Sequence, residues 1–413
     1  MQSSGLVAAA RLAWSFGKLT TWIRYIVHTA TPYKIFRLLV PTTSTTPPNA
    51  PTVDLEGTRW TVTEYAPLFD GDIPEFTCVS YSCGPGRVAN PLAPGEVMSN
   101  RVIPVTEAAI RSLNPAAIWV DAFCVPVQEP ERTACLLSMG AIYASAAHVV
   151  AVLSKPCSSL LDEAVQKNYP DEAGLHLLEN DAWVSRAWTY QEIVNSTRFC
   201  FTAEGSRVSL DGQQFLSEIM SGIENYKRAH GYDSFMFRSL HPRLDNLEDT
   251  IADWRMADYA ERSAYQVMSS MDRRTAERPG DCFNAMIGAI SADPLGSQYK
   301  TTIHPAEYFM QLCEEKEDFS FIFSSAPRSN APGRSWRPLA GPIPAIQPWH
   351  TFGDGQSGTL DPSCLRLHNM CRMNLGSVNA TAIQFITKRL WNTCGDSSSG
   401  NTPDQILRRL RVT

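Results

Sequence analysis

A carboxylate and an aromatic side chain stand one helical turn apart in the segment Trp183-x-x-Arg186-x-Trp188-x-x-Gln191-Glu192. On a helix, Trp188 lies four residues before Glu192 and shares its face, so a stacking surface would stand beside the carboxylate. A carboxylate in such a place can stabilise positive charge that develops on a bound molecule. Arg186 also admits a structural interpretation, in which it pairs with a carboxylate such as Glu192 or Asp121 and fixes the helix to a sheet.

Polar side chains also stand at the ends of two apolar runs. Asp121 ends the run that begins at Ala117, and Ser80 and Tyr81 end the run that begins at Phe76. In parallel α/β sheets, ligands usually bind at the carboxyl ends of the strands, so these three residues are candidates for one cleft. An Asp in this position can equally cap the following turn, and a Tyr can equally be packing.

Three other groups could do chemistry, but each lacks supporting neighbours. Cys124 would need a base beside it to act as a nucleophile, and no histidine is placed there by the sequence, which favours a buried thiol. The turn Cys83–Arg87 could bring backbone donors and an arginine near a phosphate, but it lacks the P-loop and dinucleotide fingerprints. We assign no metal, although a helical spacing could present zinc ligands from Cys364, His368 and Cys371 with Cys394 or His350.

Strand and helix patterns alternate between residues 76 and 202. Short apolar runs predict buried strands at 76–81, 117–121, 149–153 and 198–202. Apolar residues at the i, i+4, i+7 spacing predict a helix over 130–147, and a second helix is predicted over 183–194. Strand, helix and strand in this order indicate an α/β fold, with a small parallel sheet and flanking helices.

The rest of the chain suggests further parts. Beyond Ser209 the pattern is helical to about residue 291, and the last hundred residues are rich in Pro, Gly and Ser. We therefore expect a basic amphipathic N-terminal arm (1–40), a Pro/Thr-rich linker (41–54), an α/β domain (55–205), a helical extension (206–300) and an irregular C-terminal region (301–413).

The N-terminal arm carries basic and aromatic residues and no acidic ones through residue 53. Basic residues recur through it, so no run reaches the roughly 18 to 20 apolar residues that span a bilayer. A helix that packs on its own protein is the leading interpretation. A mitochondrial transit peptide and a helix that contacts a membrane surface stay open as alternatives.

Composition narrows the class of protein. The chain has 413 residues, is 44% hydrophobic and 19% charged, and carries a formal net charge of -6. This balance argues against a general nucleic-acid binder, because phosphate binding normally needs a concentrated basic face. The eleven cysteines form no CxxC pair, which favours free thiols in a reducing compartment and a cytoplasmic protein.

Three segments, in order, resemble the signature blocks of the fungal heterokaryon incompatibility (HET) domain family. Val79-Ser80-Tyr81-Ser82-Cys83-Gly84 is similar to the family's Leu-Ser-Tyr-x-Trp-Gly, with Cys83 in place of the usual tryptophan. Ile118-Trp119-Val120-Asp121-Ala122-Phe123-Cys124 is similar to Leu-Trp-Ile-Asp-Ala-x-Cys, although the family's following Ile-Asn-Gln reads Val125-Pro126-Val127-Gln128 here. The third block, from Trp183 to Glu192, is complete, and Pro279-x-Asp281 to Gly288 resembles a weaker element that often follows HET domains.

This resemblance implies a role in self/non-self recognition and programmed cell death in filamentous fungi. It implies a fold similar to TIR domains for residues 55–205, and a switch through a protein partner or self-association. Some TIR domains cleave NAD with one glutamate and others only assemble as scaffolds, so NAD is a candidate substrate and no cofactor is expected. Glu192 and Asp121 are then the candidate catalytic residues, and the candidate ligand-binding residues are Ser80, Tyr81, Arg186, Trp188 and Gln191.

Overall fold

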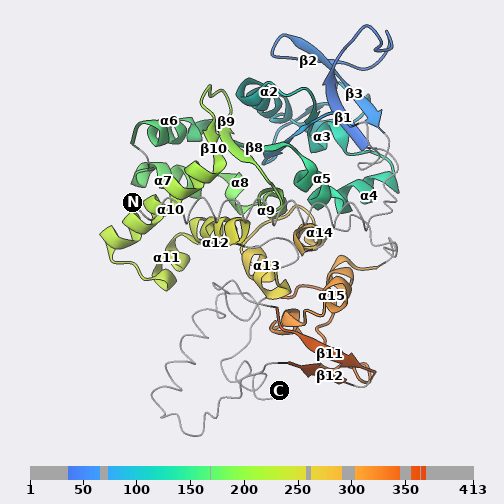
Figure 1. The fold of residues 1–413 in the computed structure, drawn as a ribbon, viewed down its shortest axis with the longest axis vertical. Helices are drawn as coiled ribbons and strands as arrows, with labels where there is room; N and C mark the ends of the chain where they lie inside the picture. The colour runs from blue at the N-terminus through green and yellow to red at the C-terminus, as the bar shows by residue number, and fades with distance from the viewer. Residues whose placement is uncertain are drawn as a thin grey trace, which may run out of the picture. The chain divides into compact units, whose positions relative to one another are not determined.

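Two compact units make up the described part of the chain (Figure 1). The computed structural model describes residues 36–65, 73–167, 169–256, 262–290, 303–344, 355–362 and 364–368. The first unit holds the described residues up to 256 together with 273–290, and the second holds 262–272 together with the described residues from 303 onward.

An eight-stranded sheet forms the centre of the first unit, in the order β10-β9-β8-β4-β7-β1-β3-β2. Strands β7, β4, β8 and β9 pair in parallel, and the strands at both edges pair antiparallel. The strands are β1 (Phe36–Pro41), β2 (Val53–Leu55), β3 (Thr58–Tyr65), β4 (Thr77–Tyr81), β7 (Ile118–Trp119), β8 (His148–Leu153), β9 (Phe199–Ala203) and β10 (Leu210–Asp211). The predicted α/β class with a parallel sheet is therefore confirmed.

Apolar side chains fill both faces of the parallel strands, because every residue of β4 and β9 is buried. Such continuous burial is expected where helices cover both faces of a sheet. Helix α2 (Val102–Leu113) packs against β4, β8 and β9, while α9 (Ala187–Val194) contacts β4 from the other side, next to α5 (Met139–Ser145) (Figure 1). The sulfhydryl of Cys78 and the hydroxyl of Ser80, alternate residues of β4, both face this second side.

The other helices of the first unit surround this core. A small hairpin of β5 (Arg87–Ala89) and β6 (Val97–Ser99) lies outside the main sheet. The remaining helices are α3 (Asp121–Cys124), α4 (Glu131–Leu137), α6 (Ser158–Lys167), α7 (Glu172–Glu179), α8 (Ala182–Ser185), α10 (Gly212–His230), α11 (Ser234–Leu240), α12 (Pro242–Met256) and α14 (Pro279–Ile290). The predicted helical region after Ser209 is thus present.

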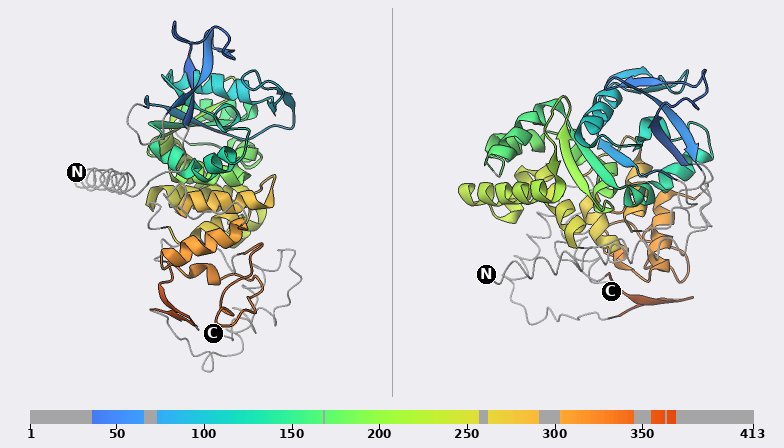
Figure 2. Two further views of the ribbon diagram at one scale, coloured as in Figure 1. Left: turned by 90° about the vertical axis from the view of Figure 1, so that its right-hand side faces the viewer. Right: turned by 45° about the horizontal axis from the view of Figure 1, so that its top comes forward.

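The start of the α/β domain differs from the prediction. Strand β1 begins at Phe36 and inserts between β7 and β3, so residues placed in the arm and the linker belong to the sheet (Figure 2). Residues 42–52 join β1 to β2 instead of separating an arm from a domain. Phe36, Leu38 and Leu39 are fully buried, which shows that apolar residues attributed to an amphipathic helix are core residues of a strand. The arm before Phe36 lies outside the described residues.

Two predicted helices are each divided into two. The helix predicted over 130–147 breaks at Ser138, whose hydroxyl donates to the Ala134 carbonyl oxygen, and continues as α5. The helix predicted over 183–194 breaks at Arg186, which has an extended backbone. At this break the backbone of Thr275 forms a β-bridge with Arg186. The Thr275 N–H donates to the Ser185 carbonyl, and the Thr275 carbonyl accepts from the Ala187 N–H.

The second unit contains α13 (Ala264–Met271), α15 (Pro305–Glu315) and a hairpin of β11 (Gly358–Asp361) and β12 (Cys364–Leu367). Asp318 ties its segments together, because its carboxylate accepts from the backbone N–H groups of Ala264 and Ser320. The predicted irregular C-terminal region therefore includes one regular helix and a hairpin, and residues 369–413 lie outside the described residues. No helix in the described ranges combines the length and apolar character needed to cross a bilayer.

Candidate functional site

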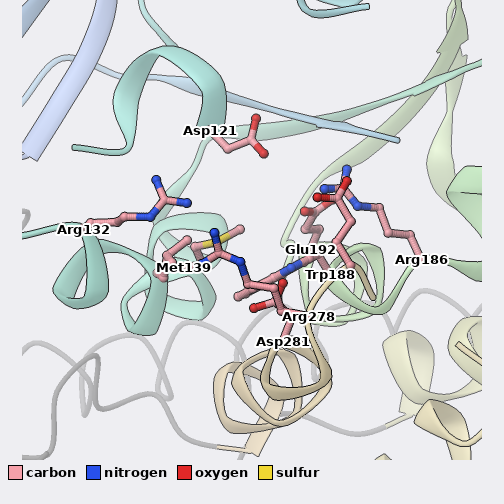
Figure 3. A pocket seen from close by; sticks show the side chains of 10 residues that line it. Asp121, Arg132, Met139, Arg186, Trp188, Glu192, Arg278 and Asp281 are labelled. Carbon is pink, nitrogen blue, oxygen red and sulfur yellow. The ribbon is translucent and has the colours of Figure 1, made fainter. Parts of the chain in front are cut away.

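A pocket of about 150 Å³ opens at the carboxyl ends of β4 and β7 (Figure 3). Its lining comes from α3, α4, α5, α9 and the start of α14, all within the first unit. Charged side chains dominate it, and the full lining is Asp121, Arg132, Leu136, Met139, Arg186, Trp188, Glu192, Glu277, Arg278 and Asp281. Ligand sites of parallel α/β sheets form at this edge, as the sequence predicted for Asp121.

Glu192 lies at the inner end of this pocket and is 5% exposed. One oxygen of its carboxylate accepts a hydrogen bond from the Ser80 hydroxyl at 2.5 Å. Burial raises the pKa of Glu192 to about 7, although the Ser80 hydrogen bond and the charge of Arg186 act in the opposite direction. A carboxyl group with such a pKa exchanges its proton near neutral pH, which suits acid–base chemistry.

Ser80 connects three elements around Glu192. Its hydroxyl is fully buried, donates to Glu192 and accepts a hydrogen bond from the Trp183 indole at 2.8 Å. Two side chains of the third block, Trp183 and Glu192, therefore hydrogen-bond Ser80 of the first block. Ser80 orients the carboxylate and does not itself line the pocket.

Tyr81 is buried behind Asp121, and of these two residues only Asp121 lines the pocket. The Tyr81 hydroxyl donates to Asp121 Oδ1 at 2.6 Å, and the same oxygen accepts from the Ala122 backbone N–H at 2.7 Å. Burial and the neighbouring Asp121 raise the pKa of Tyr81 well above its usual value, so the phenol stays a donor. Asp121 thus stands at the first position of α3, where its side chain accepts from the next backbone N–H, and it also lines the pocket.

Arg186 occupies the break between α8 and α9. Its guanidinium donates to the Tyr81 carbonyl oxygen at 2.9 Å, which fixes the loop to the end of β4. In the described residues it forms no ion pair with Glu192 or Asp121 within 4.0 Å, although both raise its pKa electrostatically against the effect of burial. The structural pairing expected for Arg186 is therefore made to a backbone carbonyl, and its charge stays near both carboxylates.

Trp188 and Glu192 both line the pocket from α9, as their spacing predicted. Trp188 is 8% exposed and lines the pocket together with Asp281 of α14. Burial raises the pKa of Asp281, while the nearby Trp188 side chain and the charge of Arg278 act in the opposite direction.

Gln191 does not line the pocket. Its side chain is fully buried and faces Gly288, because a Cβ built at Gly288 would lie 1.7 Å from Gln191 Oε1. Gly140 approaches the same point, since its Cβ would lie 2.3 Å from the Gly288 carbonyl oxygen. Gln191, predicted to bind a ligand, therefore lies at the junction of α5, α9 and α14 and not in the lining of this pocket.

Two weaker candidates, Cys124 and the turn Cys83–Arg87, have contacts that are typical of structural residues. Burial raises the pKa of Cys124 to about 12, and its thiol contacts the Ile118 carbonyl, which is consistent with a buried unreactive thiol. Arg87 folds back on its own turn to the Gly84 carbonyl and pairs with Glu277 at 3.8 Å.

The helical spacing considered for zinc does not apply at Cys364, because residues 364–367 form strand β12. Cys371, Cys394 and His350 lie outside the described residues. Across the described ranges, no group of three or more His, Cys, Asp or Glu side chains is arranged to hold a metal ion.

Several pocket residues were not predicted from the sequence. Arg132 and Met139 come from the helices after the second block, and Glu277, Arg278 and Asp281 come from the start of α14. A signal for the last group did exist, because Pro279-x-Asp281 begins the weaker element downstream of the third block. Its pattern alone does not indicate that this element packs next to α9, because that contact is long-range.

Comparison with known proteins gives one match. No curated protein and no solved structure matches the chain significantly. Residues 78–174 match the family described as Heterokaryon incompatibility protein (HET), and this range contains most of β4, all of β7 and β8, and the two predicted blocks at Ser80 and Asp121. This part of the chain is therefore similar to the heterokaryon incompatibility domain, and the match indicates a function of the heterokaryon incompatibility type.

Proposed function

We propose that this chain acts in fungal self/non-self recognition that leads to programmed cell death, by cleaving NAD or a related nucleotide in the pocket at Glu192. The observation that carries the proposal is a buried carboxyl group with a pKa of about 7 that lines a charged pocket beside an aromatic side chain. The parallel arrangement of β7, β4, β8 and β9 supports the comparison with TIR domains.

The reaction would break the bond between the ribose C1′ and the nicotinamide nitrogen. The electron pair of that bond leaves with nicotinamide, which becomes neutral, and positive charge develops on the ribose ring. The Glu192 carboxylate stabilises this charge and accepts a proton from the water whose oxygen bonds to C1′. The products are nicotinamide, ADP-ribose and the proton that Glu192 releases to solvent.

The neighbouring residues have distinct roles in this proposal. Trp188 offers an aromatic surface at the pocket wall, which it shares with Asp281. Asp121 stands across the pocket in a fixed orientation, held by the Tyr81 hydroxyl, and can accept a hydrogen bond from a ribose hydroxyl. Ser80 holds the reacting carboxylate in place.

The test is nicotinamide release from NAD by the full chain, with and without a crowding agent that forces assembly. The full chain is needed because a fragment starting at residue 51 would lack β1, which lies inside the sheet. We expect Glu192→Gln to lower the rate by roughly a hundredfold or more, the loss typical of an acid–base residue. Glu224→Gln, at an exposed glutamate of α10, is the matched control and keeps the wild-type rate.

A non-enzymatic scaffold is the second candidate, and one observation favours it. The Glu192 carboxylate accepts a hydrogen bond from Ser80, and Ser80 accepts one from the Trp183 indole. The carboxylate therefore also helps to attach α9 and α8 to β4. Absence of nicotinamide release from the wild-type chain in every assembled state would support this scaffold and contradict the enzymatic proposal. In that case the signal would pass through clustering or a protein partner.

A further inference from the structure

Two arginine side chains point into the pocket from different elements. Arg132 comes from α4, and Arg278 directly precedes α14 (Figure 3). Within the described ranges, neither guanidinium makes a hydrogen bond or an ion pair. Two cationic groups therefore face the same space without an acidic partner in contact.

Three of the four acidic residues of the pocket, in contrast, have partners. Asp121 accepts from Tyr81 and Glu192 from Ser80, while Glu277 pairs with Arg87 at 3.8 Å. Arg278 lies near enough to Asp281 to lower its pKa electrostatically, but no ion pair within 4.0 Å joins them in the described residues. The charges of Arg132 and Arg278 are consequently available to a ligand.

The segment that carries Arg278 is held firmly beside the third block. Arg274 is buried, and its guanidinium donates to the Arg186 carbonyl at 2.9 Å, to Thr189 Oγ1 at 3.2 Å and to Thr250 Oγ1. The next residue, Thr275, pairs through its backbone with both sides of the α8–α9 break. This double attachment fixes the chain that leads to Arg278 at the rim of the pocket.

We propose that Arg132 and Arg278 form a subsite for a phosphate-class oxyanion, best filled by a diphosphate. A guanidinium binds phosphate oxygens through two parallel N–H donors, and two guanidiniums from separate elements match two linked phosphates. The Glu192 end of the pocket then receives the end of the same ligand that carries no phosphate. This inference rests on the proposed function only in taking this pocket as the site, and it names the anionic part of the ligand.

The test is binding of inorganic pyrophosphate to the full chain by isothermal titration calorimetry at low salt. We expect saturable binding that weakens roughly tenfold in Arg132→Gln and in Arg278→Gln, because each variant removes one charged donor group. Arg59→Gln is the matched control, since Arg59 is exposed on β3 and does not line the pocket. ADP as a second probe distinguishes a nucleotide from free pyrophosphate, and succinate tests whether two carboxylates suffice.

The inference is overturned if pyrophosphate does not bind, if both pocket variants bind it like the wild type, or if succinate binds as tightly as pyrophosphate. Tighter binding of ADP than of pyrophosphate, with the same losses in both variants, identifies a nucleotide as the ligand and supports the subsite. These outcomes are independent of catalysis. A chain that binds pyrophosphate and releases no nicotinamide keeps the subsite and loses the enzymatic proposal, and the reverse result loses only the subsite.

Discussion

Replacing Glu192 by glutamine removes a buried ionisable group while nearly keeping its shape. The Ser80 hydroxyl can still donate to the remaining side-chain oxygen, and the nearby Tyr143 hydroxyl, which donates to the Val79 carbonyl, keeps its lone pairs to accept from the new amide. The main change is therefore the loss of the titration. This makes Glu192→Gln a direct test of the electrostatic surroundings of the site.

The pKa of Glu192 rises from 4.5 to about 7 in the folded chain, chiefly because burial penalises the charged form. Between these two values the folded state binds more proton than the unfolded state, so wild-type stability falls as pH rises through this window. Each pKa unit corresponds to about 1.4 kcal/mol, which gives a loss of about 3 kcal/mol by neutral pH and above. The glutamine variant lacks this loss, and its stability relative to the wild type should rise by that amount.

The assay is urea unfolding of the full chain and of Glu192→Gln at about pH 5 and about pH 8. Other titrating groups are common to both proteins, so they cancel in the difference between the two free energies of unfolding. Most of the gain of about 3 kcal/mol should appear between these pH values. The exposed Glu224→Gln should show no comparable change. A difference between Glu192→Gln and the wild type that is the same at both pH values would refute the reasoning, because it would mean that Glu192 ionises as in water.

Two further substitutions test the packing and the hydrogen bonding around the site. Gly288→Ala should destabilise the chain by roughly 1 to 3 kcal/mol, because its Cβ would overlap Gln191 Oε1, and wild-type stability in urea unfolding would contradict this packing. Tyr81→Phe should cost about 1 to 2 kcal/mol by leaving Asp121 without its phenolic donor, whereas Tyr169→Phe at an exposed position should cost little. Equal losses in the two tyrosine variants would show that the Tyr81 hydroxyl contributes nothing specific.

The centre of the fold could be predicted because its signals are local. The strands at Tyr81, Trp119 and Val149 follow from short apolar runs, and their parallel order follows from the helix between them. The position of Asp121 just after such a run predicts that it lies at the carboxyl edge of the sheet, where the pocket opens. Burial on both faces makes such runs easy to recognise.

The prediction and the structure differ where a segment that is distant in sequence determines the local backbone conformation. Arg186 leaves the helical conformation because Thr275, which lies far away in sequence, pairs with the backbone on both sides of it. Phe36 lies in a strand because β3 pairs with it and β7 pairs with Leu39 of the same strand, while its basic and aromatic neighbours equally suit an amphipathic helix. Periodicity within one segment carries no information about such partners.

The same long-range contacts explain why the pocket extends beyond the part of the chain that matches the family. The match ends at residue 174, yet Arg186, Trp188 and Glu192 follow it, and Asp281 closes the pocket wall from α14. Arg274 is buried with a pKa lowered to about 10 by burial, an arrangement that is unfavourable unless its donors are used. Those donors hold the backbone of Arg186. A fragment ending at residue 205 would retain β4, β7, β8 and β9 but lose this support, so the smallest part of the chain that contains the whole site runs from Phe36 to Ile290.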